Sequence, residues 1–216
     1  MNIIYLLFHG LSPYSGISKK ILHQVKGFEA CGHRVSLCTY SIADNGHRVR
    51  MINNEIIEDY GTGKPAAAKR RVSYQCIYRY AVTHQVELIY VRSFHNANPF
   101  TIRLFSKLRK AGIKIAMEIP TYPYDSEYAG FPLVTRLGIQ VDKVFRKTLA
   151  KHVNAIVTFS DYHCIFGQRT IQISNGVDFD SIPLKKTVAK NTSVIHLLGV
   201  AEVHYWHGYD RLIEGL

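Results

Sequence analysis

The sequence predicts an α/β protein with a doubly wound parallel sheet of the Rossmann-like kind. Five short apolar runs alternate with four stretches of helical periodicity: the runs are 3–8, 34–39, 88–92, 114–118 and 155–160, and the helical stretches are 18–31, 69–84, 100–111 and 137–152. The runs are nearly continuous in Ile, Val and Leu, as in strands that helices cover on both faces. With 216 residues, 47% of them hydrophobic, the chain is large enough to bury such a core.

The first helix illustrates how these elements follow from the sequence. Its apolar residues recur at helical spacing and form one face: Ile21, Leu22, Val25 and Phe28. Gly32 follows where a C-terminal cap belongs, because glycine adopts the left-handed conformation without a steric cost. Gly112 takes the same place after the helix predicted at 100–111.

The helix predicted at 137–152 is amphipathic. Its apolar stripe consists of Leu137, Val141, Val144, Phe145 and Leu149, and its basic residues are Arg136, Lys143, Arg146, Lys147 and Lys151. The stripe either packs on the protein's own sheet or rests on an anionic membrane surface, and the basic stretch 69–71 adds to the second alternative.

The last part of the sequence predicts a linker followed by the first elements of a second domain. A stretch with Pro183, a lysine pair and small polar residues predicts a linker at 181–193. A strand at 194–199 and a helix after Gly208 follow, and no stop signal ends that helix. We therefore expect a first domain at 1–180 and a truncated second domain at 194–216.

Composition narrows the function classes. The formal charge of +11 favours an anionic partner, but nucleic acid is disfavoured because the chain has no zinc-finger spacing and no basic region with a heptad zipper. No metal site is expected, since the four cysteines show no C-x-x-C spacing and His204 and His207 have no third ligand nearby. No apolar run approaches the ~20 residues that span a bilayer, so we expect a cytoplasmic protein.

Polar side chains follow the first strand. Ser15, Gly16 and Lys19 stand at the predicted helix start, a position suited to an anionic or hydroxyl-rich ligand. The alternative is a capped helix start with a solvated lysine.

The next polar group follows the strands at 88–92 and 114–118. Arg92 at an apolar strand end needs an anion or a carboxylate partner, and Glu118 ends the neighbouring strand. These two residues are candidate catalytic groups or, equally, a structural ion pair. Beyond them, Tyr122 and Asp125 could stack on and hydrogen-bond to a sugar ring. The alternative is that this aromatic loop only packs over the end of the sheet.

The segment 155–178 carries the most informative pattern. The run Ala-Ile-Val-Thr-Phe-Ser ends at Ser160, and Ile-Gln-Ile leads into Ser-Asn-Gly-Val-Asp at 174–178. Asn175 and Gly176 predict a tight reversal with positive φ, and Asp178 adds a carboxylate at the carboxyl edge of the sheet. An ordinary surface turn has the same sequence.

This segment resembles the end of the N-terminal domain in retaining glycosyltransferases of family 4, which have the GT-B fold. The run 3–8 with its Pro13–Gly16 loop, the Gly-His-Arg-Val at 32–35 and the Gly-Tyr-Asp-Arg-Leu-Ile-Glu at 208–214 are similar to the same family in the same order. The resemblance implies that Ser15, Gly16, Lys19, His95, Tyr122 and Asp125 face an acceptor. It also implies that Asn175, Gly176, Asp178, His207 and Arg211 lie on the donor side.

The resemblance implies a metal-independent enzyme without a cofactor that transfers a sugar from a nucleotide sugar to a glycan or lipid-linked acceptor in polysaccharide synthesis, at the inner face of the membrane. The chain departs from the family where Val200 and His207 replace phosphate-binding Arg and Lys, and the paired glutamates of the donor site would fall after Leu216. We therefore expect no transferase activity from these 216 residues alone. The alternative is a non-catalytic module that binds a phosphorylated ligand or a protein partner.

Overall fold

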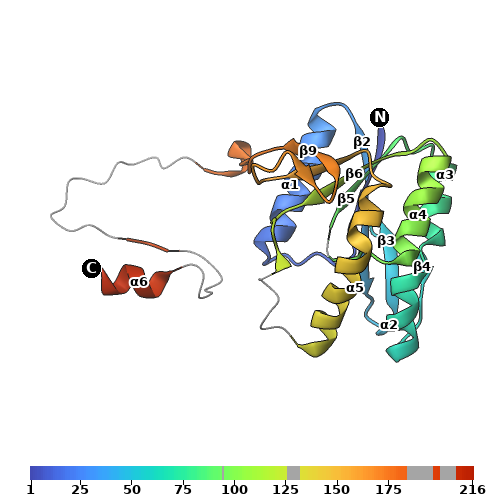
Figure 1. Ribbon diagram of the computed structural model, residues 1–216, viewed down its shortest axis with the longest axis horizontal. Coiled ribbons are helices and arrows are strands. Elements are labelled where there is room, and N and C mark those ends of the chain that lie inside the picture. Colours follow the sequence, from blue (N-terminus) through green and yellow to red (C-terminus); the bar gives the residue numbers. More distant parts are fainter. Residues whose placement is uncertain (94, 126–131, 184–196, 200–207) are drawn as a thin grey trace. The chain divides into compact units, whose positions relative to one another are not determined.

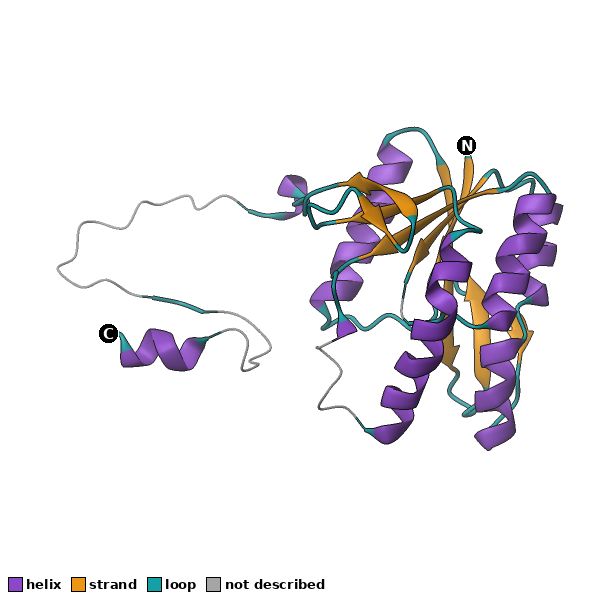
Figure 2. Cartoon of the chain, viewed as in Figure 1, coloured by secondary structure: helices purple, strands orange, loops and turns teal. Residues whose placement is uncertain are grey.

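The computed structural model describes residues 1–93, 95–125, 132–183, 197–199 and 208–216 (Figure 1). The chain divides into two compact units, 1–177 and 178–216. The first unit is an α/β structure in which helices cover both faces of one sheet (Figure 2).

The sheet has the order β4-β3-β2-β1-β5-β6-β7-β9-β8 in the described part of the chain. Its central strands are parallel: β2 (Arg34–Ile42), β1 (Asn2–Leu6), β5 (Leu88–Arg92), β6 (Lys114–Ile119), β7 (Ala155–Thr158) and β9 (Gln168–Gln172). The edges are antiparallel: β3 (Arg48–Ile52), β4 (Glu55–Asp59) and β8 (Cys164–Ile165). The predicted α/β class is confirmed, and the sheet is mixed rather than wholly parallel.

The strands β3 and β4 form a hairpin at one edge of the sheet that was not predicted from the sequence. Asn53 and Asn54 join β3 to β4 with φ of 49° and 70°. Two consecutive positive φ angles are what a two-residue hairpin needs, and asparagine tolerates them better than most residues.

The single helix predicted at 69–84 is two helices, α2 (Gly63–Val72) and α3 (Gln75–Thr83). Ser73 between them is extended, with φ of −100° and ψ of 109°. The break places the buried Tyr74 ring edge-on to Phe8, at a centroid distance of 5.8 Å. Tertiary packing therefore overrides the helical pattern here.

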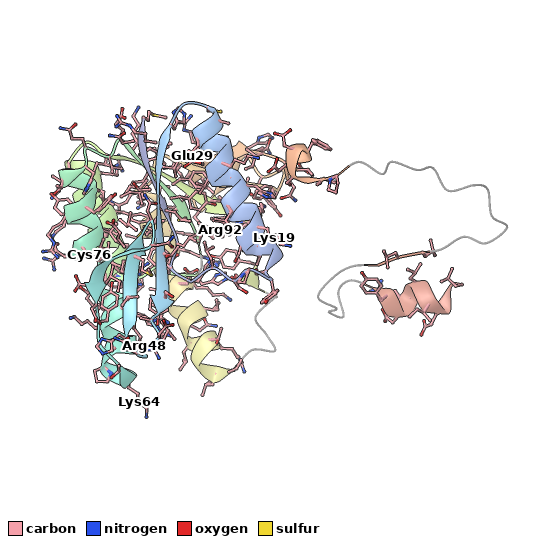
Figure 3. The ribbon with its side chains drawn as sticks, turned by 180° about the vertical axis from the view of Figure 1, so that it is seen from behind. Lys19, Glu29, Arg48, Lys64, Cys76 and Arg92 are labelled. Atoms are coloured by element: carbon pink, nitrogen blue, oxygen red, sulfur yellow. The ribbon has the colours of Figure 1, made fainter. Side chains whose placement is uncertain are left out.

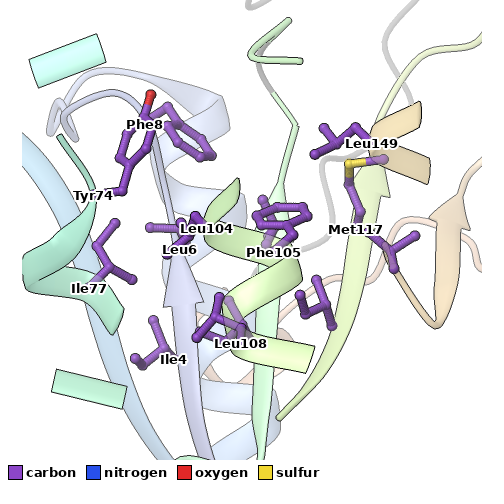
Figure 4. Close-up of a cluster of buried hydrophobic side chains, with 14 of the residues drawn as sticks. Ile4, Leu6, Phe8, Tyr74, Ile77, Leu104, Phe105, Leu108, Met117 and Leu149 are labelled. Carbon is purple, nitrogen blue, oxygen red and sulfur yellow. The ribbon is translucent and has the colours of Figure 1, made fainter. Parts of the chain in front are cut away.

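The helices form two layers. The helix α1 (Gly16–Ala30) covers one face with a small core around Tyr5 and Ile21. On the other face α3, α4 (Pro99–Lys110) and α5 (Leu133–Ala150) cover the larger core, in which Phe105 and Leu108 lie fully buried among strand residues (Figure 4). The predicted caps Gly32 and Gly112 are confirmed by φ of 78° and 81°. Leu22, expected in the core, is 46% exposed.

The tight reversal predicted at Asn175 and Gly176 is wrong, because neither residue has a positive φ. The chain instead leaves β9 in an irregular segment, where the Ile173 N–H still donates to the Thr158 carbonyl at 2.9 Å.

The second unit contains a short 3-10 helix, Phe179–Ser181, and the helix α6 (Tyr209–Glu214), which follows Gly208 as predicted. Most of the predicted strand at 194–199 lies outside the described residues, and 197–199 have no regular structure. None of the helices that the structure describes has both the length and the apolar composition needed to cross a bilayer.

Candidate functional site

A cleft of about 740 Å³ opens in the first unit at the carboxyl ends of β1, β5 and β6. The strand β1 lies between β2 and β5, so the order of the strands reverses direction at β1. The cleft therefore lies at the switch point of the sheet, where open α/β sheets bind ligands. The lining includes the loop after β1, the start of α1, residues after β5 and β6, and Asn175.

The start of α1 forms one wall of the cleft. The Ser15 hydroxyl accepts a hydrogen bond from the Ser18 N–H at 3.4 Å and caps the helix, and the buried Ser18 hydroxyl accepts from the Ser12 N–H at 2.9 Å. Ser15 and Gly16, two of the candidate residues chosen from the sequence, line the cleft. A Cβ on Gly16 would meet no atom within 4 Å, so the space above it is open to a ligand.

Lys20, which was not predicted from the sequence, lines the cleft. The predicted Lys19 is exposed (Figure 3) and is not part of the lining. The Lys20 ammonium donates to Asn175 Oδ1 at 2.7 Å and lies 3.5 Å from the Phe159 ring centroid. Burial lowers the pKa of Lys20, while the Glu118 charge opposes this. The spacing could have identified it, since Lys20 lies four residues after Gly16 and therefore on the same helix face.

Arg92 and Glu118 form the predicted ion pair at the floor of the cleft. Arg92 lines the cleft, whereas Glu118 is fully buried beneath it. The second carboxylate oxygen of Glu118 accepts from the Tyr90 hydroxyl at 2.6 Å and from Gln24 at 2.8 Å, and Gln24 in turn accepts from the Tyr5 hydroxyl at 2.6 Å. Burial and the Glu118 charge raise the pKa of Tyr90 and of Tyr5, so both remain hydrogen-bond donors.

His95 lies at the cleft with a φ of 47°, and its ring contacts Tyr124 at a centroid distance of 4.6 Å. The buried Asp142 of α5 holds this region in place: it accepts from the Ala97 N–H at 3.0 Å and from the Tyr124 hydroxyl at 2.8 Å. Burial lowers the pKa of His95, against the opposing charges of Asp142 and Asp125. The sequence analysis did not select Asp142.

The other two residues predicted on the acceptor side, Tyr122 and Asp125, are not part of the cleft lining. Tyr122 packs edge-on against Tyr162 and Phe166. Asp125 accepts two hydrogen bonds from Arg146, at 2.7 and 3.1 Å, which hold its pKa below the ordinary value.

Of the predicted donor-side residues, Asn175 lines the cleft, and Gly176, the next residue in the chain, is exposed. Asp178 precedes the 3-10 helix of the second unit, and Arg211 is exposed on α6. His207 lies outside the described residues. In the described residues no cluster of three or more His, Cys, Asp or Glu side chains is suited to a metal.

Removing the buried carboxylate should destabilise the protein strongly. Glu118→Gln leaves the Arg92 charge buried without its partner, and we expect a loss of about 3 to 5 kcal/mol in the free energy of unfolding, measured in urea. The double variant Glu118→Gln/Arg92→Met should regain part of this loss, because the isolated charge is gone. A double variant no more stable than Glu118→Gln would contradict this assignment.

The lowered pKa of His95 makes stability depend on pH. Below its ordinary value of 6.5 the unfolded chain binds a proton that folded His95 resists, so stability falls as pH falls through that window. Between about pH 7.5 and about pH 5.5, His95→Asn, which tolerates the positive φ, should lose less stability than wild type does. His163→Asn, at an exposed position, is the control, and its free energy of unfolding should change with pH as that of wild type does. An equal change with pH in His95→Asn and wild type would disprove the contribution of His95.

Comparison of the sequence with protein-family models and with curated proteins finds no match.

Proposed function

We propose that the chain is the acceptor-side half of a retaining GT-B glycosyltransferase resembling family 4. The observation that carries the proposal is the cleft, which gathers Lys20, Arg92 and His95 with the open backbone at Gly16 at the switch point of the sheet. Cationic, imidazole and hydroxyl groups around a partly open cleft suit a polyhydroxylated ligand.

In the proposed reaction, the bond between the anomeric carbon and the diphosphate of a nucleotide sugar breaks, and an acceptor oxygen forms a glycosidic bond with retained configuration. The nucleoside diphosphate leaves, and its leaving oxygen takes up the proton that the acceptor hydroxyl loses. The cleft residues orient the acceptor, and closure against a donor-binding domain brings the reacting atoms to about 3 to 3.5 Å. Glu118 acts by positioning Arg92, because it is buried beneath the cleft floor.

The alternative is a non-catalytic module for a phosphorylated ligand. Lys20 favours it, because this lysine lies one turn into α1, where the helix N-terminus also favours an anion. The two proposals differ in the ligand that the cleft recognises.

The ligand class can be tested by thermal unfolding at fixed protein concentration with neutral di- and trisaccharides, nucleotide sugars, and free nucleoside diphosphates. For the transferase we expect a saccharide at about 100 times its Kd to raise the melting temperature by about 5 to 10 °C. Lys20→Met should lose most of the shift, and the matched control Lys19→Met should keep it.

Stabilisation by phosphorylated ligands with no saccharide effect would instead favour the binding module. No shift with any probe, or equal shifts in the Lys19 and Lys20 variants, would contradict both uses of the cleft.

The proposal includes contact with an anionic membrane surface through α5. Of the predicted stripe, Leu149 is buried and Phe145 half-buried, but Leu137, Val141 and Val144 are exposed, and Leu133 extends the line by one turn. The exposed fractions of Leu133 and Val144 are 68% and 70%. Arg136 and Lys147 are exposed on the same helix, so the surface combines apolar and basic side chains as membrane-surface helices do.

Vesicle co-sedimentation tests this contact. Wild type should bind phosphatidylglycerol vesicles more than phosphatidylcholine vesicles, and Val144→Ser should bind the former at least about threefold less, since it exposes a hydroxyl in the apolar stripe. The control Val82→Ser replaces an exposed valine on α3 and should bind as wild type does. Equal binding by the two variants would refute the α5 surface.

A further inference from the structure

Two arginines of β3 lie on the same face of the sheet as Tyr40. Residues directly opposite each other in antiparallel strands share a face, and β2 pairs with β3 as Tyr40 with Arg50 and Ile42 with Arg48. The helix α2 lies against β3 (Figure 1) and brings Arg70 to the same place.

Two guanidinium groups contact the Tyr40 side chain, and Arg50 stands opposite Tyr40 in the neighbouring strand. Arg48 donates to the Tyr40 hydroxyl at 2.7 Å, and the Arg70 guanidinium carbon lies 4.1 Å from the centre of the ring. Arg50 is 1% exposed and donates to the Leu7 carbonyl at 2.7 Å. We call Arg48, Arg50, Arg70 and Tyr40 the arginine cluster.

The arginine cluster contains no counter-ion of its own. Across the described residues, none of its three arginines is within 4.0 Å of a carboxylate oxygen. Glu58 stands opposite Arg50 in β4, but its carboxylate lies 4.0 Å from Lys69 and 3.7 Å from Arg79. The Nε atoms of Arg50 and Arg70 are buried and have no hydrogen-bond partner in the part of the chain that the structure describes.

The arrangement is electrostatically unfavourable for Arg70 without an anion, whereas the pKa of Arg50 is raised, against the effect of burial, by Cys38 and Tyr60. Burial lowers the pKa of Arg70; the tyrosine opposes this, and the charges of Arg71, Arg48 and Arg50 lower it further. The aromatic ring and the C-terminal dipole of α2 offset part of the repulsion. The unpartnered donors remain, and burying a donor or a charge without a partner is costly.

We propose that the arginine cluster binds a phosphate group. A guanidinium group can donate two parallel hydrogen bonds to a phosphate, which an ammonium group cannot do. Because β3 and α2 both contribute donors, the site suits a tetrahedral anion with several acceptor oxygens. Arg48 and Arg70 are half-buried and contact the phosphate, and Arg50 supplies charge from beneath. The site shares no residue with the cleft lining but adjoins it, since the Tyr40 N–H donates to the His9 carbonyl at 3.3 Å. It does not require transferase activity.

Isothermal titration of the full chain with inorganic phosphate, against chloride and acetate at equal ionic strength, tests the site. Wild type should bind phosphate in preference to both, and Arg48→Gln and Arg70→Gln should each weaken binding by about tenfold or more, as expected for loss of a charge-assisted hydrogen bond. Arg34→Gln removes one charge at the opposite end of β2 and should bind as wild type does. Lys20→Met should also retain binding, which separates this site from the cleft.

A competition experiment with phosphatidylglycerol vesicles tests whether the bound phosphate belongs to a lipid headgroup or to a soluble molecule. If phosphate displaces wild type from the vesicles and Arg70→Gln binds them weakly, the ligand is a lipid headgroup; if vesicle binding is unchanged, it is a soluble phosphate. The proposal is overturned if phosphate binds no better than acetate, if both arginine variants bind as Arg34→Gln does, or if Lys20→Met abolishes binding. Circular dichroism of each variant ensures that lost binding does not reflect unfolding.

Discussion

The buried carboxylate of Glu118 is the constraint on which the centre of the structure depends. A fully buried charge is tolerated only with several donors, and Glu118 obtains them from Arg92 and Tyr90 of β5 and Gln24 of α1. Gln24 is fixed in turn by Tyr5 of β1. One side chain therefore links three neighbouring strands to the helix on their outer face and holds the Arg92 guanidinium at the cleft floor.

The central part of the fold could be predicted because continuous apolar runs and helical periodicity are local signals. The edges could not be predicted from those signals. The hairpin at Asn53 and Asn54 joins strands that are partly polar, so its evidence lies in the turn rather than in an apolar run. The split between α2 and α3 depends on where Tyr74 packs against Phe8, which is a tertiary contact that periodicity does not contain.

The site was predictable to the extent that topology determines it. Arg92 and Glu118 meet because neighbouring parallel strands end at one edge, and the loop after β1 lines the cleft for the same reason. Helix faces were harder to assign. In α5, apolar residues lie on two faces, and the inner face includes Ile139, Asp142 and Leu149 rather than the whole stripe from Leu137. The role of Asp142 therefore became visible only from its contacts with Ala97 and Tyr124.

The two cationic regions differ in how their charge is balanced, and this separates the ligands that they suit. In the cleft, Glu118 neutralises Arg92 and the Lys20 ammonium donates to the uncharged amide of Asn175, so less of the positive charge there needs an anion from a ligand. In the arginine cluster no such partner is present among the described residues, so an anion is needed to complete it. The loop of His9 and Gly10 lines the first region and contacts Tyr40 of the second. One loop therefore connects two regions that suit ligands of different charge.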